Sequence, residues 1–120
     1  MAKGDDIQNR LVQMAVGILD LCDELPSTNA GKHISGQLLR SGTSPAPNYA
    51  EARGAESGND FIHKLGIVLK ELNETETRLE IIQKRRMLPE ERFAHVLQEC
   101  SELCKIIAVS RRTAREKRRG

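Results

Sequence analysis

Five polar side chains lie on segments whose remaining pattern is that of a helical bundle: Ser44, Asn48, Glu51, Glu74 and Thr77. Asn48 and Glu51 are three residues apart, so they share one face of a helix. Glu74 and Thr77 have the same spacing, and the two pairs can therefore meet across a helix interface. A buried carboxylate needs hydrogen-bond donors, which the amide and hydroxyls of this set can supply. We interpret the set as a structural polar network or, alternatively, as a contact site for a ligand or another subunit.

Clustered carboxylates in a helical bundle also raise the question of a di-iron centre. The carboxylates to consider are Glu51, Glu71, Glu74 and Glu76. Such a centre needs Glu-x-x-His on two helices, whereas the sequence offers Asp60-x-x-His63 once and places Glu91 four residues from His95. No Ser or Cys nucleophile has a His at a suggestive spacing, and neither G-x-G-x-x-G nor a P-loop occurs. We therefore expect no catalytic residue, no metal, no cofactor and no enzymatic activity.

The elements that position these side chains follow from apolar residues recurring at alternating steps of four and three. The first stripe covers residues 5–25 and ends at Pro26. The second begins at Ile34, the third begins after a cap at Ser57 or Asn59, and the fourth begins at Pro89. Four amphipathic helices joined by short turns predict an all-α, antiparallel up-down-up-down four-helix bundle.

The second helix contains two prolines, Pro45 and Pro47. A proline inside a helix costs about 3 kcal/mol, and the residue before a proline is disfavoured in the α region. We therefore expect this helix to be kinked or broken between Thr43 and Asn48 and to resume through residues 49–53.

Length and composition point to one globular domain. A chain of 120 residues can form a single ordinary core. No apolar run approaches the roughly 20 residues of a membrane span, and the N-terminus lacks an apolar segment of the kind found in signal peptides. Cys22, Cys100 and Cys104 lie on apolar stripes, which predicts buried, reduced thiols. We expect a cytoplasmic protein with no membrane partner.

Positive charge is concentrated at the C-terminus. From residue 111 onward six cations accompany one carboxylate, a formal charge of +5 that leaves −3 for the rest of a chain totalling +2. The six are Arg111, Arg112, Arg115, Lys117, Arg118 and Arg119. We expect residues 1–110 to form the bundle and residues 111–120 to form a basic tail that extends the fourth helix and contacts nucleic-acid phosphates.

The few aromatic residues limit how nucleic acid can be recognised. Tyr49, Phe61 and Phe93 are the whole set, and we expect both phenylalanines in the core. Without stacking platforms, binding should be weak, directed at the backbone, indifferent to sequence and sensitive to salt. The cluster at residues 84–86 (Lys, Arg, Arg) would contribute if the third helix ended beside the tail.

Four segments, in this order, resemble one known family: 41–44 (SGTS), 48–52 (NYAEA), 55–65 (AESGNDFIHKL) and 70–76 (KELNETE). The family is that of the four-helix-bundle or 23S rRNA intervening-sequence proteins. The resemblance implies a left-handed antiparallel four-helix bundle that assembles into a ring-like homopentamer and is encoded in some bacteria within ribosomal RNA genes. It implies no established reaction. Relatives usually have an apolar and a small residue where this chain has Pro45 and Pro47, which makes the second helix less regular here.

Two functions from different classes remain open. In the first, the protein is an oligomeric accessory that binds RNA or DNA, as the accessory proteins of diversity-generating retroelements look to do; oligomerisation would gather several basic tails. In the second, it is a structural or protein-interaction module, with no nucleic-acid role, that presents a surface to a reverse transcriptase or another protein. Gly17, Gly42 and Gly66 would permit close helix approach within or between subunits, in keeping with a homo-oligomer.

Overall fold

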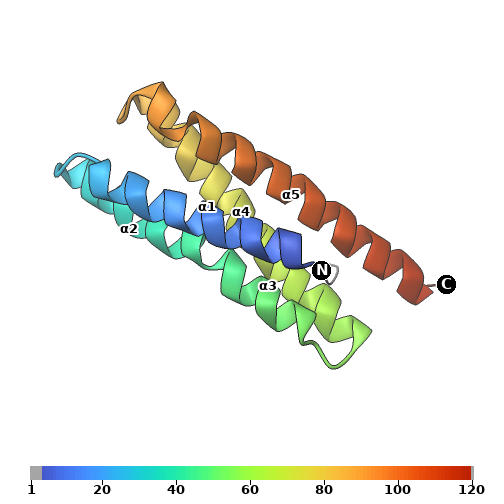
Figure 1. Cartoon of the computed structure of the whole chain (residues 1–120). Coiled ribbons are helices and arrows are strands. Elements are labelled where there is room, and N and C mark those ends of the chain that lie inside the picture. The colour runs from blue at the N-terminus through green and yellow to red at the C-terminus, as the bar shows by residue number, and fades with distance from the viewer. Residues whose placement is uncertain (1–3, 120) are drawn as a thin grey trace.

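The computed structural model describes residues 4–119, and for Arg119 only the backbone. Its elements are α1 (Asp5–Glu24), α2 (Asn29–Thr43), α3 (Pro45–Arg53), α4 (Gly58–Arg85) and α5 (Glu90–Arg119). No strand occurs between residues 4 and 119. The chain reverses direction at each of three turns, and α2 and α3 together form one of four bundle helices (Figure 1). The predicted all-α four-helix bundle is confirmed.

Each of the four bundle helices packs against two neighbours, so the helices surround a common core. α1 packs against α2 and α3 on one side and against α5 on the other, and α4 likewise packs against α2, α3 and α5. The molecule measures 50 × 26 × 19 Å, so its two ends are far apart. A binding site on this elongated molecule must therefore be built from side chains at the same end of the bundle or along the same side of it.

Helix ends follow local side-chain chemistry. Ser57, one of the two predicted caps, accepts a hydrogen bond from the backbone N–H of Asp60 at 3.1 Å and begins α4. Thr28 plays the same role for α2. Arg86 ends α4 in the left-handed region, with φ 55° and ψ 45°, which leads the chain into the turn before α5.

The junction between α2 and α3 shows how the two prolines are accommodated. The break lies at Ser44, and α3 begins at Pro45, earlier than the expected restart at Tyr49. Both prolines lie in the first turn of α3, where backbone N–H groups have no partner within the helix, so their missing donors cost little. Ser44 itself keeps helical angles and accepts a hydrogen bond from the backbone N–H of Asn48 at 3.2 Å.

Three glycines lie where another helix packs closely. A Cβ atom at Gly42 would lie 2.7 Å from Ile18 of α1, and one at Gly66 would lie 3.1 Å from the Arg111 guanidinium of α5. At Gly17 a Cβ would lie 3.0 Å from a side chain of α5. These glycines therefore serve contacts within the chain, and they give no support to a homo-oligomer.

The core contains most of the predicted stripes, with one exception among the aromatics. Phe93 is fully buried and is among the largest core side chains. Phe61 is only partly buried, so the expectation that both phenylalanines lie in the core is wrong for Phe61. It lies in the first turn of α4, near the end of the bundle, where fewer neighbours surround it.

Candidate nucleic-acid interface

The predicted polar set is brought together only in part. The Asn48 amide donates to the backbone oxygen and the hydroxyl of Ser44, each at 2.9 Å. Both residues belong to one helical turn, so these bonds support the junction between α2 and α3. The pairing of the bundle helices does not depend on them.

The other three members lie elsewhere. Glu51 is exposed and lies 3.5 Å from the Lys64 ammonium. Thr77 is exposed and donates to a backbone oxygen of its own helix. The five residues therefore form no common network within the chain, and the expectation of one is wrong. The physical reason is register: Thr77 follows fully buried Thr75 by two positions, which places it about 200° around the helix from the core face.

A different polar group links α2 to α4, and sequence reasoning missed it. Arg40 lies 3.4 Å from Glu71 and 3.9 Å from Glu74, and the Glu71 side chain is only 10% exposed. Within the described chain, the Glu74 Oε2, Arg78 Nη1 and Ser41 Oγ atoms are buried without a hydrogen-bond partner. The sequence contained one signal of this group. Glu71 lies next to Leu72 of the core stripe, so its carboxylate could be expected near the buried side of the helix and in need of a partner.

The three cysteines are buried and free, as predicted. Burial raises the pKa of the Cys22 thiol. A hydrogen bond with Cys104, together with burial, raises the pKa of the Cys100 thiol. The same hydrogen bond lowers the pKa of the Cys104 thiol. Thiols with a raised pKa, such as those of Cys22 and Cys100, are poor nucleophiles and poor metal ligands. Among the described residues, no group of three or more His, Cys, Asp or Glu side chains is arranged to hold a metal ion.

The basic C-terminal residues continue α5 without interruption and pack on α4. The Arg111 guanidinium donates to the backbone oxygen of Ile62 at 3.2 Å, over the open space left by Gly66. Further along, the stem of Arg118 passes close to Gly58, where a Cβ would lie 3.4 Å from its Cδ atom. The last turns of α5 are thus partly supported by the start of α4. The side chain of Arg119, also a predicted contact, lies outside the described residues.

No described side chain forms an ion pair with these cations. Four other arginines form ion pairs: Arg10, Arg40, Arg53 and Arg92. Among described side chains, none of the following has a carboxylate oxygen within 4.0 Å: Arg111, Arg112, Arg115, Lys117 and Arg118. The end of α5 therefore keeps its positive charge available for an external anion.

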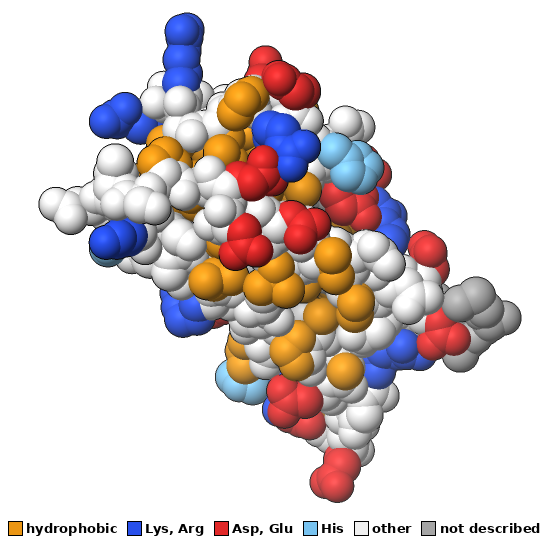
Figure 2. Space-filling model, turned by 60° about the vertical axis from the view of Figure 1, so that its left-hand side comes forward, with side chains coloured by type: hydrophobic (Ala, Val, Ile, Leu, Met, Phe, Trp, Pro, Cys, Tyr) orange, Lys and Arg blue, Asp and Glu red, His pale blue; other side chains and the backbone are white. Residues whose placement is uncertain are grey.

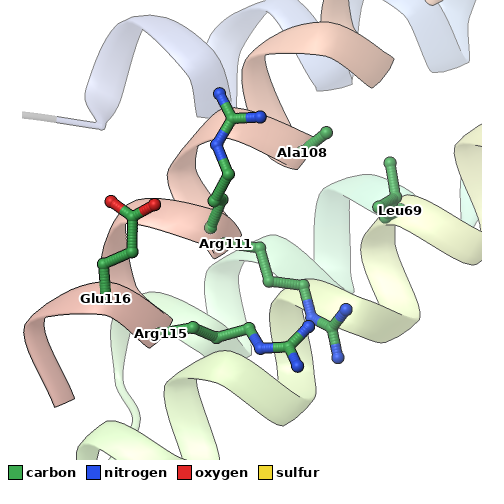
Figure 3. A pocket seen from close by; sticks show the side chains of 6 residues that line it. Leu69, Ala108, Arg111, Arg115 and Glu116 are labelled. Atoms are coloured by element: carbon green, nitrogen blue, oxygen red, sulfur yellow. The ribbon is translucent and has the colours of Figure 1, made fainter. Parts of the chain in front are cut away.

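An open pocket of about 380 Å³ lies between α4 and α5 at this end. Leu69 and Ala108 form its apolar part, and Arg111, Arg112 and Arg115 provide its cations. Arg111 and Arg115 extend from α5 toward the side on which α4 lies, whereas Glu116 points away from them (Figure 3). Several guanidinium groups in one shallow site suit phosphate oxygens, which they bind by charge-assisted hydrogen bonds.

The second basic cluster does not join the first. Lys84 and Arg85 end α4 and Arg86 follows, at the turn where α5 begins. Arg111 lies 21 residues further along α5, a distance of about 30 Å at 1.5 Å per residue. The two clusters lie at opposite ends of the molecule (Figure 1). The third bundle helix therefore does not end beside the basic tail, and residues 84–86 cannot contribute to the same binding surface within one chain.

A second apolar stripe lies on the outer side of α1. Val12, Val16 and Leu19 are 44%, 48% and 46% exposed and follow one another at steps of four and three. Hydrophobic side chains gather on one face of the molecule, with acidic side chains along the borders of the group (Figure 2). None of the described helices is long and apolar enough to cross a membrane.

Comparisons with known protein families and with solved structures agree on the family and the fold of this chain. A model of the 23S rRNA-intervening sequence protein family matches residues 5–109. The fold is similar to the crystal structure of a protein of unknown function from the S23 ribosomal protein family of Bacteroides thetaiotaomicron VPI-5482. The two share 36% identity and a TM-score of 0.78 over 84% of this chain and 94% of that one. A search of curated proteins gives no match.

Proposed function

Since the chain belongs to the 23S rRNA-intervening sequence protein family, we propose that it is a non-enzymatic, homo-oligomeric protein that binds the backbone of RNA or DNA. The observation that carries the proposal is the unneutralised charge at the end of α5. Five described cations occupy about two turns of helix there, with no carboxylate within ion-pair distance among the described side chains. Like charges at neighbouring helical positions repel one another, and phosphates would relieve that repulsion.

The arrangement favours contacts to phosphate over contacts to bases. Arg112 and Arg115 are exposed on the surface of α5, where their guanidinium groups can reach the phosphate oxygens of a nucleic-acid backbone. A surface of this kind fixes the nucleic acid by its backbone and carries little sequence information. Binding should therefore be similar for unrelated sequences and should weaken steeply as salt rises.

Homo-oligomerisation is the second part of the proposal, and a pentamer is the assembly implied by the family resemblance. The exposed stripe of Val12, Val16 and Leu19 supports it, because a continuous apolar stripe on a helix gains stability when another subunit covers it. Assembly would also bring several α5 ends onto one particle and raise the avidity for a polyanion.

Light scattering coupled to gel filtration tests the assembly. The chain has a mass of 13.4 kDa, and a single species near five times that mass is expected at micromolar concentration. Val16→Asp should shift the protein toward smaller species, because it places a charge in the middle of the stripe. A wild-type monomer would contradict this part of the proposal.

A charge-reversal pair tests the binding surface. The double variant Arg112→Glu and Arg115→Glu changes two exposed residues of α5 and spares Arg111, which packs on α4. The matched control is Lys84→Glu with Arg85→Glu, which makes the same change in charge at the opposite end. Fluorescence anisotropy with a mixed-sequence RNA should show a large loss for the first variant and a small one for the control. Equal losses would mean that net charge alone acts and that α5 is not the binding surface.

The exposed stripe on α1 also favours a second candidate function. If it remains uncovered after assembly, the protein is a module for protein interaction, with a reverse transcriptase or another protein as the partner. Solvent accessibility of Val16 decides between the two uses: a Val16→Cys thiol that reacts slowly in the wild-type assembly lies in a subunit interface. A fast-reacting thiol leaves the stripe free for a partner.

A further inference from the structure

A larger pocket, of about 800 Å³, lies at the same end of the bundle as the basic residues. It is bounded by the start of α1, by α3, by the first turn of α4 and by the last turns of α5. Its volume lies within the range of small-molecule sites, roughly 300–1,000 Å³. The sequence analysis predicted phosphate contacts for Lys117 and Arg118, which line this pocket, but gave no role to its apolar part.

The lining of the pocket includes apolar and aromatic side chains. Tyr49 and Phe61, two of the three aromatic residues of the chain, both line it. Phe61 is only partly buried and Val109, also in the lining, is 49% exposed. Part of the Phe61 side chain and an aliphatic side chain are therefore accessible in a concave site, which suits a flat apolar group.

The lining of the pocket also includes three cations. Lys117 and Arg118 line it from α5, and neither has a carboxylate within ion-pair distance in the described part of the chain. Arg53 lines it from α3, but its charge is already paired with Asp5 at 2.6 Å. A ligand of this pocket should therefore combine a flat ring with one or two negative charges next to it.

We propose that this pocket binds an unpaired nucleotide of a single-stranded nucleic acid, with the base against Phe61 and the adjoining phosphate at Lys117 and Arg118. The inference rests on the proposed nucleic-acid function and adds to it a preference for single-stranded over duplex nucleic acid. In a duplex the bases are stacked inside and cannot enter, so a single strand gains a contact that a duplex lacks. An acidic helix of a partner protein would match the charge as well, but the partly accessible aromatic ring of Phe61 favours a base.

The test compares two probes with equal charge. One is a fluorescein-labelled 20-mer of thymidylate, and the other is a 20-mer of abasic residues with the same number of phosphates. Base stacking on an aromatic side chain changes affinity by about 5- to 150-fold, so the wild-type protein should bind the first probe about tenfold more tightly. Equal affinities for the two probes would overturn the inference.

A variant locates the effect. Phe61→Leu keeps an apolar side chain at a half-buried position and removes the ring, so the fold should persist and the preference for the base-containing probe should disappear. Ile81→Ala is the matched control, since Ile81 is an exposed apolar residue on α4 near its other end. If Phe61→Leu keeps the full preference, the base does not lie in this pocket.

Tyr49 supplies an independent signal. It is the only tyrosine and the chain has no tryptophan, so the intrinsic fluorescence comes from this pocket alone. Saturation with unlabelled oligothymidylate should quench it, while the abasic oligomer should leave it nearly unchanged. Quenching of equal size by both oligomers would contradict a base in the pocket.

The outcomes separate this inference from the proposed function. If neither 20-mer binds at low salt, the nucleic-acid function itself fails. If both bind equally and Phe61→Leu has no effect, backbone binding through α5 stands and the nucleotide pocket is refuted.

Discussion

Replacing Gly42 by alanine should destabilise the protein because the new methyl group would overlap a side chain that cannot move away. Its Cβ would lie 2.7 Å and 2.8 Å from the two γ-carbons of Ile18, whereas carbon atoms in contact are normally about 3.5–4.0 Å apart. Ile18 is fully buried in α1. Overpacking of this kind costs about 1–3 kcal/mol, and the better helix propensity of alanine returns up to about 1 kcal/mol. After the full propensity gain, the expected net loss is up to about 2 kcal/mol.

Gly36 provides the matched control in the same helix. A Cβ there would meet no atom within 4 Å, and the residue is exposed, so Gly36→Ala should raise stability by about 0.5–1 kcal/mol. Urea unfolding followed by circular dichroism, at one protein concentration, measures both variants. Equal stabilities for Gly42→Ala and Gly36→Ala would refute the close packing of α2 on α1 at this point.

Three further predictions concern single side chains. Arg86→Gly should raise the melting temperature, since a non-glycine residue at φ 55° costs about 1–2 kcal/mol; a lower value would contradict this strain. Glu99→Gln should flatten the acid loss of stability, because hydrogen bonding to Arg10 lowers the pKa of Glu99. This contribution is present above the unfolded pKa of about 4.3 and lost as the pH falls through the folded value; identical pH profiles in urea unfolding would count against it. Glu74→Ala should change stability by less than about 1 kcal/mol, because Arg40 is 3.9 Å away and 58% exposed; a loss above about 2 kcal/mol in thermal unfolding would reveal a further partner.

The helices were predictable because their apolar periodicity is regular. The stripe through Leu65, Val68 and Leu72 is fully buried, as the alternation of steps required. The break in the second helix was predicted from its prolines. Its restart was placed too late because a proline disrupts a helix interior and fits a first turn, and sequence alone did not show which of these Pro45 occupies.

The candidate site was harder to predict because spacing shows which residues share a face but not where that face points. Thr77 shares a face with Glu74, yet it faces solvent. Arg40 was missed because its partner Glu71 belongs to another helix, 31 positions along the chain. Phe61 fits a core stripe by period, but it lies at the bundle end, where the stripe opens into a pocket.

The slope of log Kd against log salt concentration tests the central claim most directly, namely that the end of α5 binds the nucleic-acid backbone. For duplex DNA each neutralised phosphate contributes about −0.9 to the slope of log affinity. The wild-type protein should show a steep slope, reduced by roughly one per cation when Arg112 and Arg115 are both replaced by glutamine. The same slope in the wild-type protein and in this variant, or no binding at low salt, would contradict the claim.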